Sequence, residues 1–279
     1  MSGSSSYYLK NLFSESLAGR KKIFELYPLD FGEFLTFKEI SWRSFKKMSG
    51  RFNSPEYHRL IKFYDEYIEF GGFPEVVLAK SQQDKKDLLV DVLSSYINID
   101  IKTLADFRHD EQIYSLIKLL GQRLGSRLNY QKLSSIAKIA RATLQNYLDF
   151  LEKTYLIARL PVLTKNPDRE IVKAKKIYFL DNGLANMVAD LSPGQKLENA
   201  AFTQLHHLGN LSYYARKTGQ EIDFIVDKNW AIEVKETPMP QDWSILQKLA
   251  DGLSIKNYTI VSRRPHPHFT NYLWAGEIK

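Results

Sequence analysis

The sequence has 279 residues and no cysteine, which excludes disulfides and thiolate metal sites. A reducing cytoplasm is the simplest setting for such a chain, so we expect a cytoplasmic location. No apolar run approaches the roughly 20 residues needed to cross a bilayer, so we expect no membrane contact. The first residues, MSGSSSYYLK, lack a basic segment followed by an apolar one, so they are not typical of a secretory signal.

Composition is that of a globular protein, with 44% hydrophobic and 25% charged residues. The net charge of +7 is concentrated in one segment. Residues 101–176 hold fifteen Lys/Arg and seven Asp/Glu, an excess of eight that leaves the remainder close to neutral. A basic segment of this kind is typical of a polyanion-binding module, because neutralisation of phosphates drives nucleic-acid affinity. The alternative is a solvated basic surface without a partner.

The first part of the chain, residues 1–105, is mainly helical by pattern. The run IFELYPL (23–29) predicts a strand closed by its proline, and FGEFLTF predicts the start of a helix. EYHRLIKFYDEYIEF has helical spacing, and GGFP at 71–74 should end that helix sharply. A further helix is predicted over 84–104.

Residues 106–165 predict a winged helix-turn-helix, because three amphipathic helices precede two strands around a polar turn. Polar residues at the start of its third helix lie where side chains reach base edges. Nearby lysines could contact phosphates. The predicted nucleic-acid-binding residues are Lys138, Arg141, Thr143, Gln145, Asn146, Lys173, Lys175 and Lys176. The alternative is a winged helix that serves as a lid or docking surface.

Residues 166–279 predict an α/β domain containing the hairpin EIDFIV-DKN-WAIEVK. Strict alternation would place Glu221 and Asp223 on one face of the first strand, with Ile222, Phe224 and Val226 on the other. Asp223 would then lie across the ladder from Glu233.

This grouping suits a magnesium site. Asp223 and Glu233 would hold Mg²⁺, which would polarise a phosphate and activate water. Lys235 could position that water or stabilise developing charge, and Glu198 could add a metal contact or an orienting bond. The spacing of Asp223 and Glu233-Val234-Lys235, preceded by Glu198, resembles the PD-(D/E)xK nuclease superfamily. Many relatives of such folds bind without cutting, and a solvated strand face is the plainest alternative.

A wider resemblance covers nearly the whole chain. SGSSSYYLKNLFSESLAGR, IFELYPLDFGEFL, GGFPEVV, KKIYFLDNGL, LENAAFTQL and the hairpin follow one another in this order. They resemble prokaryotic AAA-type ATPases that end in a PD-(D/E)xK-type domain. The resemblance implies that Gly3, Ser4, Ser5 and Arg20 lie near nucleotide phosphates. It places Gly71, Gly72 and Pro74 in a lid near the adenine.

The chain departs from that family because no G-x-x-x-x-G-K-[ST] occurs in it. It looks like the back half of such an ATPase, so we expect no ATPase activity from this chain alone. ATP would be a cofactor only with a protein partner that supplies the P-loop.

Together these patterns predict a mixed α/β, multidomain protein with three parts. They are an AAA-core and helical-lid remnant (1–105), a winged helix-turn-helix (106–165) and a PD-(D/E)xK nuclease-like sheet domain (166–279). The predicted function is binding of nucleic acid, DNA in particular, with a Mg-dependent nuclease-like site. The alternatives are a non-catalytic interaction module and half of a split ATPase.

Overall fold

The computed structural model describes residues 24–42, 51–97, 110–164, 174–216 and 218–278. Its helices are α2 (Phe31–Phe37), α3 (Ser54–Phe70), α4 (Pro74–Leu78), α5 (Gln82–Ser95), α7 (Asp110–Gly121), α8 (Tyr130–Ala137), α9 (Arg141–Lys153), α11 (Asn182–Val188), α12 (Pro193–Leu205), α13 (Pro240–Gly252) and the short 3₁₀ helix η2 (Ala275–Glu277). Its strands are β1 (Ile157–Leu160), β2 (Lys176–Phe179), β3 (Leu211–Ala215), β4 (Glu221–Val226), β5 (Trp230–Lys235), β6 (Asn257–Ser262) and β7 (Leu273–Trp274). The protein is therefore a mixed α/β structure, as predicted.

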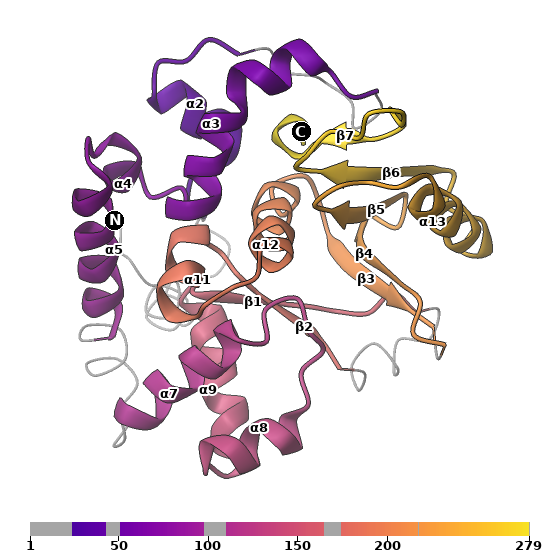
Figure 1. The fold of residues 1–279 in the computed structure, drawn as a ribbon. Helices are drawn as coiled ribbons and strands as arrows, with labels where there is room; N and C mark the ends of the chain where they lie inside the picture. Colours follow the sequence, from indigo (N-terminus) through magenta and orange to yellow (C-terminus); the bar gives the residue numbers. More distant parts are fainter. Residues whose placement is uncertain (1–23, 43–50, 98–109, 165–173, 217, 279) are drawn as a thin grey trace.

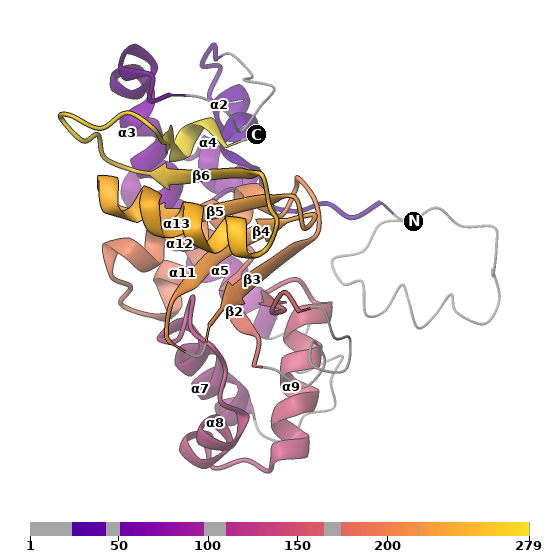
Figure 2. The ribbon, with the colours of Figure 1, turned by 90° about the vertical axis from the view of Figure 1, so that its right-hand side faces the viewer.

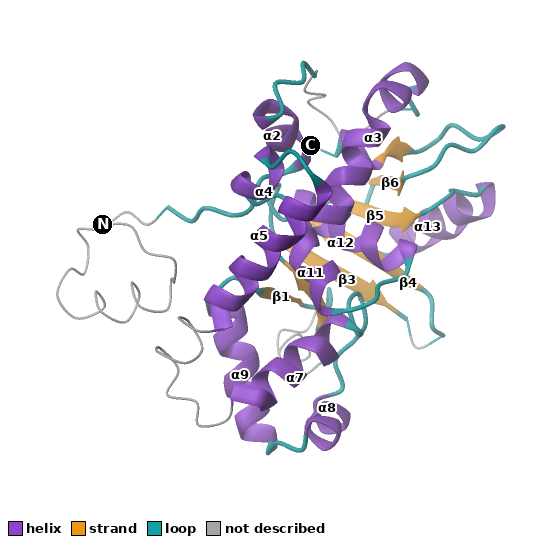
Figure 3. Cartoon of the chain, turned by 60° about the vertical axis from the view of Figure 1, so that its left-hand side comes forward, coloured by secondary structure: helices purple, strands orange, loops and turns teal. Residues whose placement is uncertain are grey.

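The first helices begin at side-chain caps that satisfy their free backbone N–H groups. Asp30 and Glu33 form a capping box at α2, and Asn53 caps α3. Helix α3 ends at Gly71, whose φ of +78° favours glycine, so the predicted break at GGFP is confirmed. Helix α3 packs against α5 and α11 (Figure 3).

The strand predicted over 23–29 is wrong for the residues that the structure describes. Residues 24–30 are extended but belong to no sheet, and the side chains of Phe24 and Leu26 are exposed. Backbone groups of this segment find other partners, because the N–H of Leu29 donates to the carbonyl of Gly72 at 2.8 Å. An apolar, β-prone run becomes a strand only where another strand pairs with it. Residues 98–104 of the helix predicted after α4 lie outside the described residues.

Helices α7, α8 and α9 gather at one end of the molecule (Figure 2). Strand β1 follows α9 and pairs antiparallel with β2, which confirms the predicted two-stranded ribbon. The segment between α7 and α8 adds to this ribbon, because Gly125 and Leu128 donate backbone hydrogen bonds to Ile177 and Lys175. Three helices and a ribbon thus occur in the predicted order, while the division of the chain into domains stays a prediction.

A five-stranded mixed sheet, in the order β3-β4-β5-β6-β7, forms the other end. The pairs β3–β4 and β4–β5 are antiparallel, and α13 connects β5 to its parallel neighbour β6. Figure 1 shows α12 on the face of the sheet toward α3 and α11, and α13 on the opposite face. Apolar clusters fill both interfaces: Phe202 of α12 packs against Phe224, and Leu249 of α13 joins the cluster of Ile225.

No helix among the described residues is long and apolar enough to span a membrane. The larger core cluster runs from Phe31 in α2 to Ile278 beyond η2 and includes residues of α7–α9 and of the sheet. It therefore ties the helical parts to the face of the sheet that α12 covers.

Candidate active site on strands β2, β4 and β5

A β-bulge in β4 sets the direction of the Asp223 side chain. Ser212 of β3 pairs with Ile225, whereas Tyr214 pairs with Ile222, so Asp223 and Phe224 together lie opposite the single intervening residue of β3. The strict alternation predicted for β4 is therefore wrong. Asp223 shares the α12 face of the sheet with Phe224, because an extra residue in one strand restarts the alternation. Bulges of this kind often turn a side chain toward a site.

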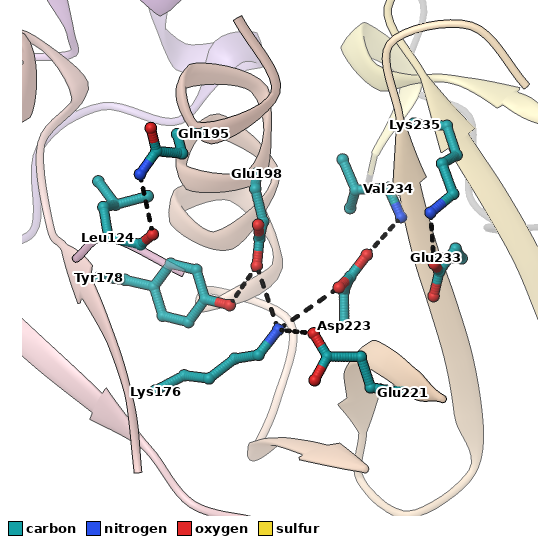
Figure 4. Close-up of polar contacts among 10 residues, drawn as sticks. All are labelled: Leu124, Lys176, Tyr178, Gln195, Glu198, Glu221, Asp223, Glu233, Val234 and Lys235. Carbon is teal, nitrogen blue, oxygen red and sulfur yellow. Dashed lines mark hydrogen bonds and ion pairs between the residues drawn. The ribbon is translucent and has the colours of Figure 1, made fainter. Parts of the chain in front are cut away.

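The β4–β5 register ends at the pair Phe224–Ile232, and Asp223 and Glu233 are the next residues of the two strands. Pairing of Asp223 with Glu233 across the ladder stays a prediction. Oδ2 of Asp223 accepts a hydrogen bond of 2.9 Å from the backbone N–H of Val234. Oε1 of Glu233 accepts 2.7 Å from Nζ of Lys235, so the Glu-x-Lys pair on β5 is formed (Figure 4).

The other carboxylate oxygen of Glu233 is an exception to ordinary polar pairing. Oε2 is buried and has no hydrogen-bond partner among the described residues. Buried polar atoms are nearly always paired with protein, water or an ion, so an unpaired one calls for an explanation. This oxygen is available to a ligand that the protein itself does not supply.

Lys176 is the site residue whose role sequence reasoning missed. Its Nζ lies 3.1 Å from Oε1 of Glu221, 3.4 Å from Oε1 of Glu198 and 3.5 Å from Oδ1 of Asp223 (Figure 4). The side chain is only 2% exposed and its ammonium lies 5.6 Å from the ring centre of Tyr213. The expectation that Lys176 contacts a phosphate at the surface is therefore wrong. A signal was present, since Lys176 and Tyr178 share one face of a buried strand.

Glu198 joins the site from α12. Its Oε1 accepts a hydrogen bond of 2.7 Å from the hydroxyl of Tyr178 and also faces Lys176. Gly125 leaves room for this carboxylate, because a Cβ there would lie 2.7 Å from Oε2 of Glu198, and its φ of +73° also favours glycine. Glu198 and Asp223 thus face the same lysine, and the predicted role of Glu198 as a metal contact or an orienting residue stays a prediction.

Burial and mutual repulsion perturb these carboxylates strongly. Burial first, and the charge of Asp223 second, raise the pKa of Glu233 to about 8 and that of Glu198 to about 7. Burial by itself would lower the pKa of Lys176, but the charges of Asp223, Glu198 and Glu221 outweigh it and raise this pKa above its ordinary value. Several perturbed groups that touch one another are typical of functional sites.

The donor set fits a metal held by two carboxylates. Mg²⁺ commonly takes one or two protein carboxylates and keeps several waters. Asp223 supplies one carboxylate and Glu233 supplies the buried oxygen without a partner. Across the described ranges, no group of three or more acidic or histidine side chains is arranged to hold a metal. A pocket of about 270 Å³ adjoins Glu233 on the α13 side and is also lined by Glu221, Lys235 and Asp242.

The predicted base-contacting residues lie on α9, at the end of the molecule away from α13 (Figure 2). Arg141, Gln145 and Asn146 are exposed and Thr143 is half-buried. Lys138 is exposed in a left-handed turn just before the helix. Lys175 is half-buried just before β2, and Lys173 lies outside the described residues. Their contact with nucleic acid stays a prediction.

The predicted nucleotide site is described only in part. Gly3, Ser4, Ser5 and Arg20 lie outside the described residues, whereas Gly71 and Gly72 lie in the turn between α3 and α4, and Pro74 is the first residue of α4.

That turn packs tightly against its neighbours. The N–H of Gly72 donates 2.8 Å to Oδ2 of Asp181, and a Cβ on Gly72 would lie 2.2 Å from the carbonyl oxygen of Leu29. A Cβ on Gly71 would lie 2.3 Å from the Asp181 carboxylate. Close packing thus accounts for both glycines, and the proposed adenine contact stays a prediction.

Comparison with known proteins gives relatives without an assigned activity. Over 277 residues the chain is 27% identical to the uncharacterized protein MJ1544 of Methanocaldococcus jannaschii, an alignment that covers 93% of this chain and 61% of the relative. An uncharacterized protein of Haemophilus influenzae is 28% identical over 237 residues, with 82% of this chain and 56% of the relative covered. The chain therefore spans little more than half the length of these curated relatives. No solved structure matches it.

A family model matches the middle of the chain. It covers residues 61–195, from α3 to the first turn of α12, and is described as a domain of unknown function (DUF8612). The matched range includes α7–α9, the ribbon and Lys176, whereas Glu198, Asp223 and Glu233 lie beyond it. The chain is thus homologous to uncharacterized prokaryotic proteins, and its residues 61–195 match the DUF8612 domain.

Proposed function

We propose that this chain binds nucleic acid, DNA in particular, and carries a magnesium-dependent, nuclease-like site where β4 and β5 meet. One observation carries the proposal. Glu233 is the acid of the Glu-x-Lys pair, is bonded to Lys235 through one oxygen, and keeps its second, buried oxygen without a partner beside Asp223. This is the state expected of a carboxylate that receives a cation.

Each residue has a distinct role in the proposed site. Asp223 and Glu233 would hold Mg²⁺, which when bound polarises a phosphate and lowers the pKa of water. The backbone N–H of Val234 fixes the carboxylate of Asp223, so this group is oriented before any ligand arrives. Lys235, already bonded to Glu233, would place its ammonium near the charge that develops on the phosphate. Glu198 would orient Lys176 rather than the substrate.

DNA contact is proposed at the start of α9, in the middle of the basic segment 101–176. Arg141 and Lys138 present exposed positive charge at the start of α9, where the exposed amides of Gln145 and Asn146 follow. Cationic side chains at this position would contact phosphates, and the amides are of the type that reads adenine edges.

A specific observation favours a second candidate, the non-catalytic interaction module. The ammonium of Lys176 pairs with three carboxylates from within the protein, so these side chains are held together without a metal. On this alternative the sheet domain is a scaffold and DNA or protein binding is the whole function. The two relatives extend beyond the part that aligns with this chain, and a partner chain that supplies a P-loop stays a proposal.

Cleavage assays distinguish these functions. Supercoiled, linear and branched DNA would be incubated with Mg²⁺ or Mn²⁺ and with wild type, Glu233→Ala or Asp251→Ala. Asp251 is an exposed acid on α13 and serves as the matched control. We expect cutting by wild type and Asp251→Ala and its loss in Glu233→Ala. No cutting by any of the three, with salt-sensitive DNA binding retained, would favour the interaction module.

A further inference from the structure

The carboxylate cluster contains two separate cation environments. One lies among Glu198, Glu221 and Asp223, and Nζ of Lys176 fills it at 3.1–3.5 Å from an oxygen of each. The other lies at Glu233, whose Oε1 meets Lys235 and whose buried Oε2 has no partner in the described part of the chain. Asp223 borders both, with Oδ1 toward Lys176 and Oδ2 toward Val234 (Figure 4).

Charge balance decides how many ions such a cluster can accept. The raised pKa values of Glu233 and Glu198 leave protons on these acids near neutral pH, and a bound cation displaces them. The carboxylates of Glu198, Glu221, Asp223 and Glu233 then contribute four negative charges, and the two lysines contribute two positive charges. The sum of minus two equals the charge that a single divalent ion neutralises. A second ion would leave an uncompensated double positive charge in a largely buried place, which is strongly unfavourable.

Geometry leads to the same limit. The ammonium of Lys176 is 2% exposed and occupies the space between its three carboxylates, so no ion can enter there while the lysine stays. This arrangement also explains why no set of three acidic side chains in the described residues is spaced for a metal. Their oxygens surround an ammonium nitrogen, at 3.1–3.5 Å, rather than an ion that binds oxygen at about 2.1 Å.

We propose that Lys176 is a built-in replacement for a second metal ion, so that the site takes one divalent ion at Asp223 and Glu233. Lys176 is on this view a positioning residue: it holds Glu198, Glu221 and Asp223 together and restricts the site to one-metal chemistry. The inference rests on the proposed function, because it assumes that the remaining position receives a divalent ion.

The experiment counts Mn²⁺ ions bound per chain by equilibrium dialysis and by the spin-resonance signal of free Mn²⁺. Wild type should bind one ion. Lys176→Gln empties the space among three carboxylates and should bind two. The double variant Lys176→Gln with Glu221→Gln restores the net charge of minus two and should bind one again. Lys248→Gln, an exposed lysine on α13, is the matched control and should bind one.

Two ions in wild type, or the same count in wild type and a folded Lys176→Gln, would overturn the inference. If Lys176→Gln does not fold, the inference is tested by the number of ions bound to wild type and to Lys176→Arg. Lys176→Arg keeps the positive charge and should bind one ion. DNA cleavage is measured on the same samples. One bound ion without cleavage would contradict the nuclease function and leave the inference standing. Cleavage with two ions bound to wild type would contradict the inference and leave the nuclease function standing.

Discussion

Asp181 should make the stability of this protein fall as the pH rises. Its carboxylate caps α11, accepts N–H groups of Leu184 and Gly72, and is 3% exposed. Burial raises its pKa from 3.8 to about 6, although the backbone N–H groups of Gly72 and Leu184 act in the opposite direction. The Asp181 carboxylate thus links the turn between α3 and α4 to α11, although burial makes its negative charge unfavourable.

The sign and size follow from linkage. The folded state binds the proton of Asp181 more tightly than the unfolded state, so the stabilisation by the neutral acid is complete below pH 3.8 and is lost as the pH rises through 6. The pKa difference corresponds to about 3 kcal/mol in total. Between pH 5 and pH 8 the free energy of unfolding should fall by about 1.4 kcal/mol through this group.

The variant Asp181→Asn removes this titration while keeping an oxygen acceptor for the helix cap. Its amide places a donor opposite the N–H of Gly72, so we expect lower stability at pH 5 but a smaller loss between pH 5 and pH 8. Urea unfolding of both proteins at a series of pH values measures the difference. An unchanged gap between wild type and variant across this range would refute the reasoning, because the two proteins would then bind protons alike on unfolding.

Three further predictions concern residues outside the carboxylate cluster. Gly72→Ala should lower the free energy of unfolding by about 1–3 kcal/mol, because its Cβ would collide with the carbonyl oxygen of Leu29. Gly194→Ala is the control and should be neutral or mildly stabilising, because the space around its Cβ is open. Thermal melts measure both variants against wild type. Arg159→Ala should cost about 1.5–3 kcal/mol in urea unfolding, because its guanidinium makes charged hydrogen bonds to two carboxylates that stay partly solvated, and a loss under about 0.5 kcal/mol would contradict that. Arg141→Ala should weaken DNA binding and reduce the slope of log affinity against log salt by about 1, whereas an unchanged slope in fluorescence anisotropy titrations would place the phosphate contacts elsewhere.

Much of the secondary structure could be predicted from local patterns. Helical spacing in 54–70 and caps such as Asp30 with Glu33 act within a few residues, so the sequence carries them directly. The hairpin of β4 and β5 was likewise predictable, because a short turn between apolar runs fixes an antiparallel neighbour. The strand predicted at 23–29 shows the limit of this reasoning, since an extended run forms a strand only with a partner.

The composition of the candidate site could be predicted only in part. Asp223, Glu233 and Lys235 were found from their spacing on two adjacent strands, and Glu198 from its place at the start of a helix. Lys176 was predicted to contact a phosphate because it belongs to the group of lysines near the end of the predicted winged helix-turn-helix. Its partners are Glu198, Glu221 and Asp223, which follow 22 to 47 residues later in the chain. No local sequence pattern therefore predicts these ion pairs.

The sequence by itself determined which side chains were present, the periodicity of the helices and the pairing of β4 with β5. Only the tertiary structure decided that a bulge turns Asp223 toward α12, that Lys176 enters the carboxylate cluster and that one oxygen of Glu233 stays unpaired. The physical reason is that charge compensation depends on distance in space. A buried carboxylate is stabilised by whichever cation the fold brings within about 3–4 Å, and strands far apart in the chain supply that cation here.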